Sequence, residues 1–268
     1  MRGALAYLSA INLLFILLLS LSGAFGGWIG EAVCYLAFAA PILLTLFLKS
    51  KSILRLSPPR VKISRDGICL TLASAAPSLA LVFFISCLTS LILSRFGFGN
   101  VSDVSGNLAY VIFSKALFTA ILEEALFRYI PLALLAPYSR RGAIIYSALF
   151  FALVHCNPYQ IPYALAAGVI FALLDLACDS VMPSVILHFL NNLISIFWLR
   201  HSIDQSFARI YVILLVSLAL LSLPVIFLLW KRFAERIRGA LSKDGGVPIT
   251  VESVLFIILT LSISFTAL

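Results

Sequence analysis

The chain has 268 residues, of which 62% are hydrophobic and 11% are charged. Soluble domains are nearer half apolar and about a quarter charged, so an aqueous fold could not bury this much apolar surface. The long apolar runs lack the alternation of a β-barrel, and lipid admits only helices or closed barrels. The composition excludes a soluble domain and predicts an all-α, polytopic membrane helix bundle.

The apolar runs predict about eight or nine transmembrane helices. In chain order they lie near residues 4–23, 27–48, 68–94, 109–135, 142–157, 161–178, 183–200, 208–230 and 252–268. The first run approaches the ~20 residues that a span needs, so we expect an uncleaved helix rather than a signal peptide. Gly245, Gly246 and Pro248 separate the short last run, which we interpret as an added anchor.

Two basic blocks interrupt the apolar runs, one after the second run and one after the eighth. They contain Lys49, Lys51, Arg55, Arg60, Lys62 and Arg65, and Lys231, Arg232, Arg236, Arg238 and Lys243. Strict alternation puts both blocks on the side of the N-terminus and leaves Arg95, Arg200 and Arg209 on the other. Because cytoplasmic loops are rich in Lys and Arg, we expect a cytoplasmic N-terminus in the cell membrane. The net charge of +8 therefore reflects basic connections on one side of the membrane, and no nucleic-acid partner is expected.

The fourth run holds two adjacent carboxylates and a guanidinium, Glu123, Glu124 and Arg128. An ionisable group within a span costs a few kcal/mol, which makes each of them a functional candidate. Glu124 and Arg128 are four residues apart and can form a charge-assisted pair on one helix face. Glu123 points about 100° away, toward a cavity where a desolvated carboxylate suits general-base work. An ion-pair network that orients helices and a transport role remain alternatives.

Two histidines fall within predicted spans, His155 in the fifth and His188 in the seventh. Asn192 follows His188 by one helical turn, so both side chains project from one face. With Glu123 they supply a base for water, imidazoles for a developing oxyanion and an orienting amide, which is the equipment of acyl hydrolysis. His and Glu also bind zinc, so a metal site stays open, although the sequence has no H-E-x-x-H motif.

Two other mechanisms are disfavoured. Asp175 and Asp179 bracket the end of the sixth run, but Asp179 should lie in the following turn, and no partner Asp occurs in another run. Cys156 is a weak nucleophile candidate because the adjacent His155 points elsewhere on a helix. The five cysteines form no C-x-x-C pair, so we expect them to be packing residues.

Depth along the membrane limits which groups can share one site. Glu123 lies 17 residues before Arg140 and His155 lies 15 after it, so these two can meet at one depth. His188 follows the next turn closely and would sit shallower. We expect helix tilt to bring it to the same site, with a water-accessible cavity open toward the cytoplasm.

Three ordered motifs, E-E-x-x-x-R at 123–128, F-x-x-x-H at 151–155 and H-x-x-x-N at 188–192, resemble the CPBP (Abi) family. That family groups type II CAAX prenyl endopeptidases with bacteriocin-processing and bacteriocin-immunity membrane proteins. The resemblance covers roughly residues 109–200. It implies three parts: N-terminal membrane helices with a basic loop (1–108), a CPBP-like catalytic core (109–200) and C-terminal membrane helices (201–268).

The resemblance implies a glutamate-dependent intramembrane endopeptidase that hydrolyses a peptide bond of a membrane-associated peptide or protein. Glu123 would activate water, His155 would assist the base or the oxyanion, His188 with Asn192 would stabilise the tetrahedral intermediate, and Glu124 and Arg128 would support them electrostatically. No cofactor is expected, and zinc remains an alternative. The partners would be the lipid bilayer and prenylated peptides, bacteriocin leaders or membrane-anchored sorting tails. A non-catalytic immunity or binding protein of this fold and a polar-cavity transporter are the competing functions.

Overall fold

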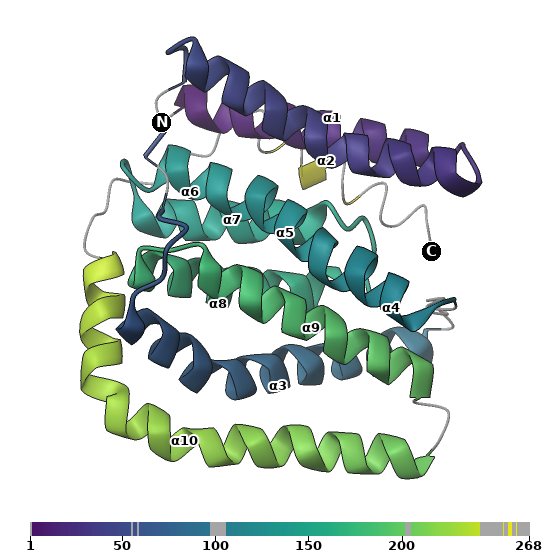
Figure 1. Ribbon diagram of the computed structural model, residues 1–268, viewed down its shortest axis with the longest axis vertical. Helices are drawn as coiled ribbons and strands as arrows, with labels where there is room; N and C mark the ends of the chain where they lie inside the picture. Colours follow the sequence, from purple (N-terminus) through teal and green to yellow (C-terminus); the bar gives the residue numbers. More distant parts are fainter. Residues whose placement is uncertain are drawn as a thin grey trace.

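Long helices packed side by side form the bundle seen in the computed structural model (Figure 1). The structure describes residues 2–54, 56–57, 59–96, 106–201 and 205–241, together with residues 254, 257, 258 and 261. Within this part of the chain the only extended pairing is an isolated bridge between Arg60 and Ser180. The predicted all-α class is confirmed.

The helices follow the predicted order. They are α1 (Arg2–Ser22), α2 (Gly27–Ser50), α3 (Arg65–Arg95), α7 (Arg140–Leu153), α8 (Ile161–Cys178), α9 (Met182–His201) and α10 (Gln205–Leu241). Between α3 and α7, the fourth span is a broken rod of α4 (Leu108–Val111), the π-helix η1 (Ile112–Phe118), α5 (Thr119–Glu124), the π-helix η2 (Ala125–Tyr129) and α6 (Ile130–Leu135).

Six of the described helices are long and apolar enough to cross a membrane, judged by length and composition. They are α1, α2, α3, α8, α9 and the Ser206–Val225 part of α10. The broken fourth rod and α7, which has 14 residues, do not reach the length that this count requires. The ninth predicted span, 252–268, lies almost wholly outside the described residues.

The predicted fifth span was four residues too long, because α7 ends at Leu153. Cys156 has a φ of 46°, a left-handed conformation that no helix continues through. The Asn157 side chain accepts a hydrogen bond of 2.9 Å from the backbone two residues later, and Pro158 also disfavours helix before it. His155 therefore lies in the turn after the helix.

Contacts between helix termini define two ends of the bundle, and the first of them we call the basic end. Here Arg60, in the connection after α2, makes backbone hydrogen bonds of 3.2 and 3.0 Å with the α8–α9 turn. Arg140 at the start of α7 donates to the C-terminal part of α10 at 2.7 Å. Arg236 of α10 pairs with Asp66 at the start of α3 at 2.8 Å. Helix α10 continues to Leu241, beyond the predicted limit of residue 230.

The other end, which we call the opposite end, brings together the start of α2, the start of α4 and the end of α9. Tyr110 of α4 donates to Glu31 of α2 at 2.9 Å. Arg200 near the end of α9 donates to the Gly106 carbonyl at 2.8 Å. Figure 1 shows the α1–α2 turn and the start of α4 on the side away from the N-terminus.

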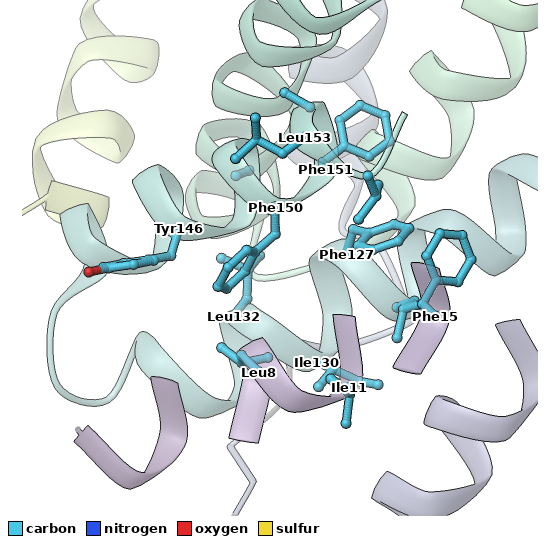
Figure 2. Packing of buried hydrophobic residues seen from close by; sticks show 14 of the residues in the cluster. Leu8, Ile11, Phe15, Phe127, Ile130, Leu132, Tyr146, Phe150, Phe151 and Leu153 are labelled. Carbon is cyan, nitrogen blue, oxygen red and sulfur yellow. The ribbon is translucent and has the colours of Figure 1, made fainter. Parts of the chain in front are cut away.

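An aromatic core joins α1, the fourth span and α7. Figure 2 shows Phe127 of η2 between Phe15 of α1 and Phe151 of α7, and the ring centroids lie 5.2 and 6.2 Å apart respectively. Phe150, also on α7, is fully buried. This core fixes η2, and with it the residues just before η2, against α7.

Small residues let α7 and α8 pack backbone to backbone. On α8, Ala164, Gly168 and Ala172 recur every four residues and so lie on one face. A Cβ added at Gly168 would lie 2.8 Å from the Ala148 Cα and 2.9 Å from its Cβ. Close approach of this kind is typical of helix contacts in membranes.

We therefore expect Gly168→Ala to destabilise the bundle by about 1–3 kcal/mol, because α7 and α8 must move apart. The thermal unfolding midpoint of the detergent-solubilised protein would report this loss. Gly239→Ala on α10 is the matched control, since a Cβ there meets nothing within 4 Å. A change of within about 1 kcal/mol is expected for the control. Equal midpoints for the two variants would contradict the packing argument.

Candidate active site

The broken fourth span presents the adjacent carboxylates at a junction between two helix types. Glu123 and Glu124 are the last two residues of α5, and η1 and η2 flank that short segment. Within this region the Thr119 hydroxyl donates to the Ser114 carbonyl, five residues earlier, at 2.9 Å. π-helical turns are rare in proteins, and those that occur are often found at functional sites.

Glu124 is fully buried and is bound on both of its oxygens. Its Oε2 lies 3.2 Å from Arg128 Nε, and neither side chain is exposed. Its Oε1 lies 2.7 Å from His188 Nδ1. The predicted pair with Arg128 is confirmed, whereas the contact with His188 was not predicted.

The Arg128 guanidinium is held by α7 as well as by Glu124. Its Nη1 donates to the Ser147 hydroxyl at 2.9 Å and to the Ser147 carbonyl at 3.2 Å. The guanidinium carbon lies 4.5 Å from the centroid of the Phe151 ring, within the range of a cation–π contact. Arg128 is thus a fixed positive charge behind Glu124.

His188 lies between the two carboxylates. Because the Glu124 carboxylate accepts hydrogen bonds, His188 Nδ1 carries the proton of that contact and Nε2 points the other way. Nε2 lies 3.6 Å from Glu123 Oε2, and the His188 side chain is only 5% exposed. The expected difference in depth is therefore absent, and His188 meets both carboxylates at one level.

His155 reaches the same region from the end of α7. Its Nδ1 donates to the Phe151 carbonyl at 2.7 Å, which satisfies a carbonyl at the helix terminus and leaves Nε2 available. The Phe151 ring stands edge-on to both imidazoles, with centroid distances of 5.1 Å to His155 and 5.4 Å to His188. One aromatic ring therefore packs against both histidines.

A cavity of about 330 Å³ lies in front of this cluster. Glu123 and His155 line it, as does Phe127, which packs beside them. Aromatic and aliphatic side chains of α1 and α2 form much of its wall, and Lys115 and Gln160 add polar groups. Of the predicted catalytic set, Glu123 and His155 line the cavity, and His188 contacts Glu123 from behind.

Asn192 lies one turn after His188 on α9, but it contacts η1. Its Nδ2 donates to the Lys115 carbonyl of η1 at 3.4 Å. The side chain that contacts His188 Nδ1 is Glu124. The sequence suggested that the Asn192 amide would orient a histidine, whereas in the structure the Glu124 carboxylate makes this contact with His188.

The available donors do not fit a zinc site. A catalytic zinc ion takes three protein ligands, and in the described part of the chain no group of three His, Cys, Asp or Glu side chains could hold a metal ion. Glu124 is already engaged by Arg128 and His188.

Asp175 is a buried acid near the end of α8 whose contact with α9 was not anticipated. Its Oδ1 accepts a hydrogen bond of 2.9 Å from the Ser184 backbone, in the first turn of α9. Ser184 precedes His188 by one turn on the same helix face. Asp175 thereby satisfies a free N–H at the start of the helix that carries His188. Asp179 caps α8 in the following turn, as predicted, with a φ of 49°.

We expect Asp175→Ala to destabilise the protein by about 1–2 kcal/mol, because the buried Ser184 N–H loses its acceptor. Asp175→Asn keeps an acceptor oxygen and should retain most of the stability. Thermal unfolding in detergent distinguishes the two variants. The anchoring role would be excluded by an Ala variant that unfolds at the same midpoint as the Asn variant.

Arg128→Met should destabilise the protein by about 3–5 kcal/mol, because it leaves the buried Glu124 charge without its cation. Adding Glu124→Gln removes that charge and should recover part of the loss. Additive effects in the double variant would contradict a direct pair. Arg238→Met, an exposed Arg→Met change on α10, is the control and should cost less than about 0.5 kcal/mol.

Comparison with known proteins finds a match over the segment that carries this site. Residues 105–194, about a third of the chain, match the family model described as type II CAAX prenyl endopeptidase Rce1-like. All three motifs lie within that segment, so the resemblance stated from them is confirmed there. No curated protein and no solved structure matches the chain.

Proposed function

We propose that the protein is an intramembrane endopeptidase in which Glu123 activates water for attack on a peptide bond. The observation that carries this proposal is the environment of Glu123. This carboxylate lines the cavity together with His155, and His188 Nε2 lies 3.6 Å behind it. A base open to a cavity and supported from behind is the arrangement that general-base hydrolysis requires.

In the proposed reaction, Glu123 removes a proton from a water molecule in the cavity. The water oxygen bonds to the scissile carbonyl carbon, and a tetrahedral oxyanion forms. When the C–N bond breaks, the proton held by Glu123 passes to the leaving amine. Atoms and charges balance over the cycle, and Glu123 returns to its ionised form.

The imidazoles assist at two points. His155 Nε2 accepts a hydrogen bond from the attacking water in the neutral ring, or donates one to the oxyanion in the protonated ring. In its protonated form His188 presents a second N–H and a positive charge to Glu123 from 3.6 Å, which stabilises the ionised carboxylate. Asn192, expected to help stabilise the intermediate, would first have to leave the Lys115 carbonyl.

The Glu124–Arg128 pair supports this chemistry without entering it. It fixes the ring of His188 through Nδ1 and supplies a positive charge in a region of low dielectric, where such a charge acts strongly. The proposal includes no cofactor. The partners are the bilayer and a membrane-associated peptide, and the N-terminus faces the cytoplasm of a cell membrane.

A transporter fits the cavity less well. Transport requires a path that opens to both faces of the membrane. On the side of Glu123 toward the basic end, every residue of α6 is buried. Among the described residues the route from Glu123 toward the basic end is therefore filled, which suits hydrolysis of a bound segment better than transport.

We expect Glu123→Gln to lower cleavage of a membrane peptide substrate by about 10²–10⁴-fold, because the amide keeps the shape of the side chain but cannot accept the proton of water. Purified protein in proteoliposomes, tested with a panel of membrane peptides, provides the measurement. Unchanged cleavage in this variant would refute the mechanism.

Glu235→Gln is the matched control, since Glu235 is an exposed carboxylate on α10 that does not line the cavity. Its rate should stay near that of the unmodified chain. A chelator should leave the rate unchanged as well. Loss of cleavage with chelator and recovery with zinc would favour the metal-dependent alternative.

A further inference from the structure

The cavity lies in one half of the bundle. It is lined by Phe15 and Leu19 in the second half of α1 and by residues between Glu31 and Phe38 in the first half of α2. Residues of the fourth span between Tyr110 and Phe127 also line it. Glu31 and Tyr110, whose hydrogen bond lies at the opposite end, both line it. The cavity therefore extends from Glu123 toward the opposite end.

The short helix α7 explains why there is space on that side. Its 14 residues span about 21 Å, whereas the hydrocarbon core of a bilayer is about 30 Å thick. Because α7 starts at the basic end, it stops inside the membrane. The connection that follows it, with His155 and Gln160, closes the inner part of the cavity instead of reaching the surface.

Toward the basic end the route from Glu123 is filled. Phe127 and Arg128 are at most 1% exposed, and the residues of α6 that follow are all buried. The connection after α2 covers this region, since its Ser57 N–H donates to the Ala133 carbonyl at 3.0 Å. The cavity thus has its mouth away from the basic end.

The charges identify which side of the membrane that mouth faces. The described residues of both basic blocks and the Arg140–Arg141 turn lie at the basic end, whereas Arg95, Arg200 and Arg209 lie near the opposite end. Connections rich in Lys and Arg stay in the cytoplasm. The opposite end is therefore the non-cytoplasmic end.

We propose that the cavity opens to the non-cytoplasmic side of the membrane, and that its substrates are membrane-anchored segments of exported proteins, cleaved at a bond on that side. This inference rests on the proposed protease function and names the substrate class of the same site. It reverses the opening toward the cytoplasm that residue counting suggested. The apolar wall from α1 and α2 receives the anchor segment, and Glu123 meets the peptide bond at its inner end.

Thiol labelling of the full chain in cells tests the direction of the mouth without any need for turnover. Cys34 lines the cavity, so one variant keeps Cys34 and replaces the other four cysteines by Ser. A cysteine-free variant with Gln160→Cys probes a second cavity position, and one with Lys62→Cys probes the exposed basic connection. The probe is a charged, membrane-impermeant maleimide.

The two cavity cysteines should react in intact cells, and Lys62→Cys should react only after permeabilisation. In inverted vesicles Lys62→Cys should react without permeabilisation, and the two cavity cysteines should not. Cavity cysteines that react only from the cytoplasmic side, or from neither side, would overturn the proposal.

A pair of single-span reporters tests the substrate class. Both carry the same apolar segment and cleavable flank, but the flank lies outside in one and in the cytoplasm in the other. We expect cleavage of the first reporter only, lost in Glu123→Gln. Glu123-dependent cleavage of the second reporter alone would overturn the substrate class while leaving the protease function standing. Cleavage of neither reporter, with cavity cysteines that react from outside, would count against the proposed function and the substrate class but not against the direction of the mouth.

Discussion

The ion pair between Arg128 and Glu124 is the interaction on which the rest of the site depends. Both side chains are fully buried, at a contact distance of 3.2 Å. Separating such charges inside a protein costs several kcal/mol, so the pair resists rearrangement. Because Glu124 also binds His188 Nδ1, the pair sets the ring orientation of His188, and His188 in turn sets the surroundings of Glu123. The base at the cavity is thus positioned from behind by a chain of three contacts.

The same pair links the chemistry to the fold. Arg128 binds Ser147 on α7, and Glu124 binds His188 on α9, so the broken fourth span is tied to two helices by polar contacts. Between membrane helices such contacts matter because lipid offers no alternative partner for a polar group. The π-helical turns on either side of α5 belong to this arrangement, since they set the rotation of Glu123 and Glu124 relative to the rest of the rod.

Sequence patterns predicted the helical class, the order of the spans and the Glu124–Arg128 pair, because hydropathy and four-residue spacing are local properties. The predicted end of the fifth span was wrong because a short polar turn was interpreted as part of an apolar run. The contact of His188 with Glu124 and the anchoring of α9 by Asp175 were missed for another reason. They join residues on different helices, and their formation depends on tilt and depth, which residue counting does not give. The roles of Glu123, His155, His188 and Asn192 stay predictions.

Phe151 contributes two separate things to the site. Its carbonyl holds His155, and any residue at that position would offer the same carbonyl. Its ring touches the guanidinium of Arg128 and both imidazoles, and only an aromatic side chain can do this. The negative face of the ring attracts the cation, and the buried ring packs against the cluster. The phenylalanine of the F-x-x-x-H motif therefore gives the charged cluster a buried aromatic wall on one side, while Glu123 and His155 line the cavity on the other.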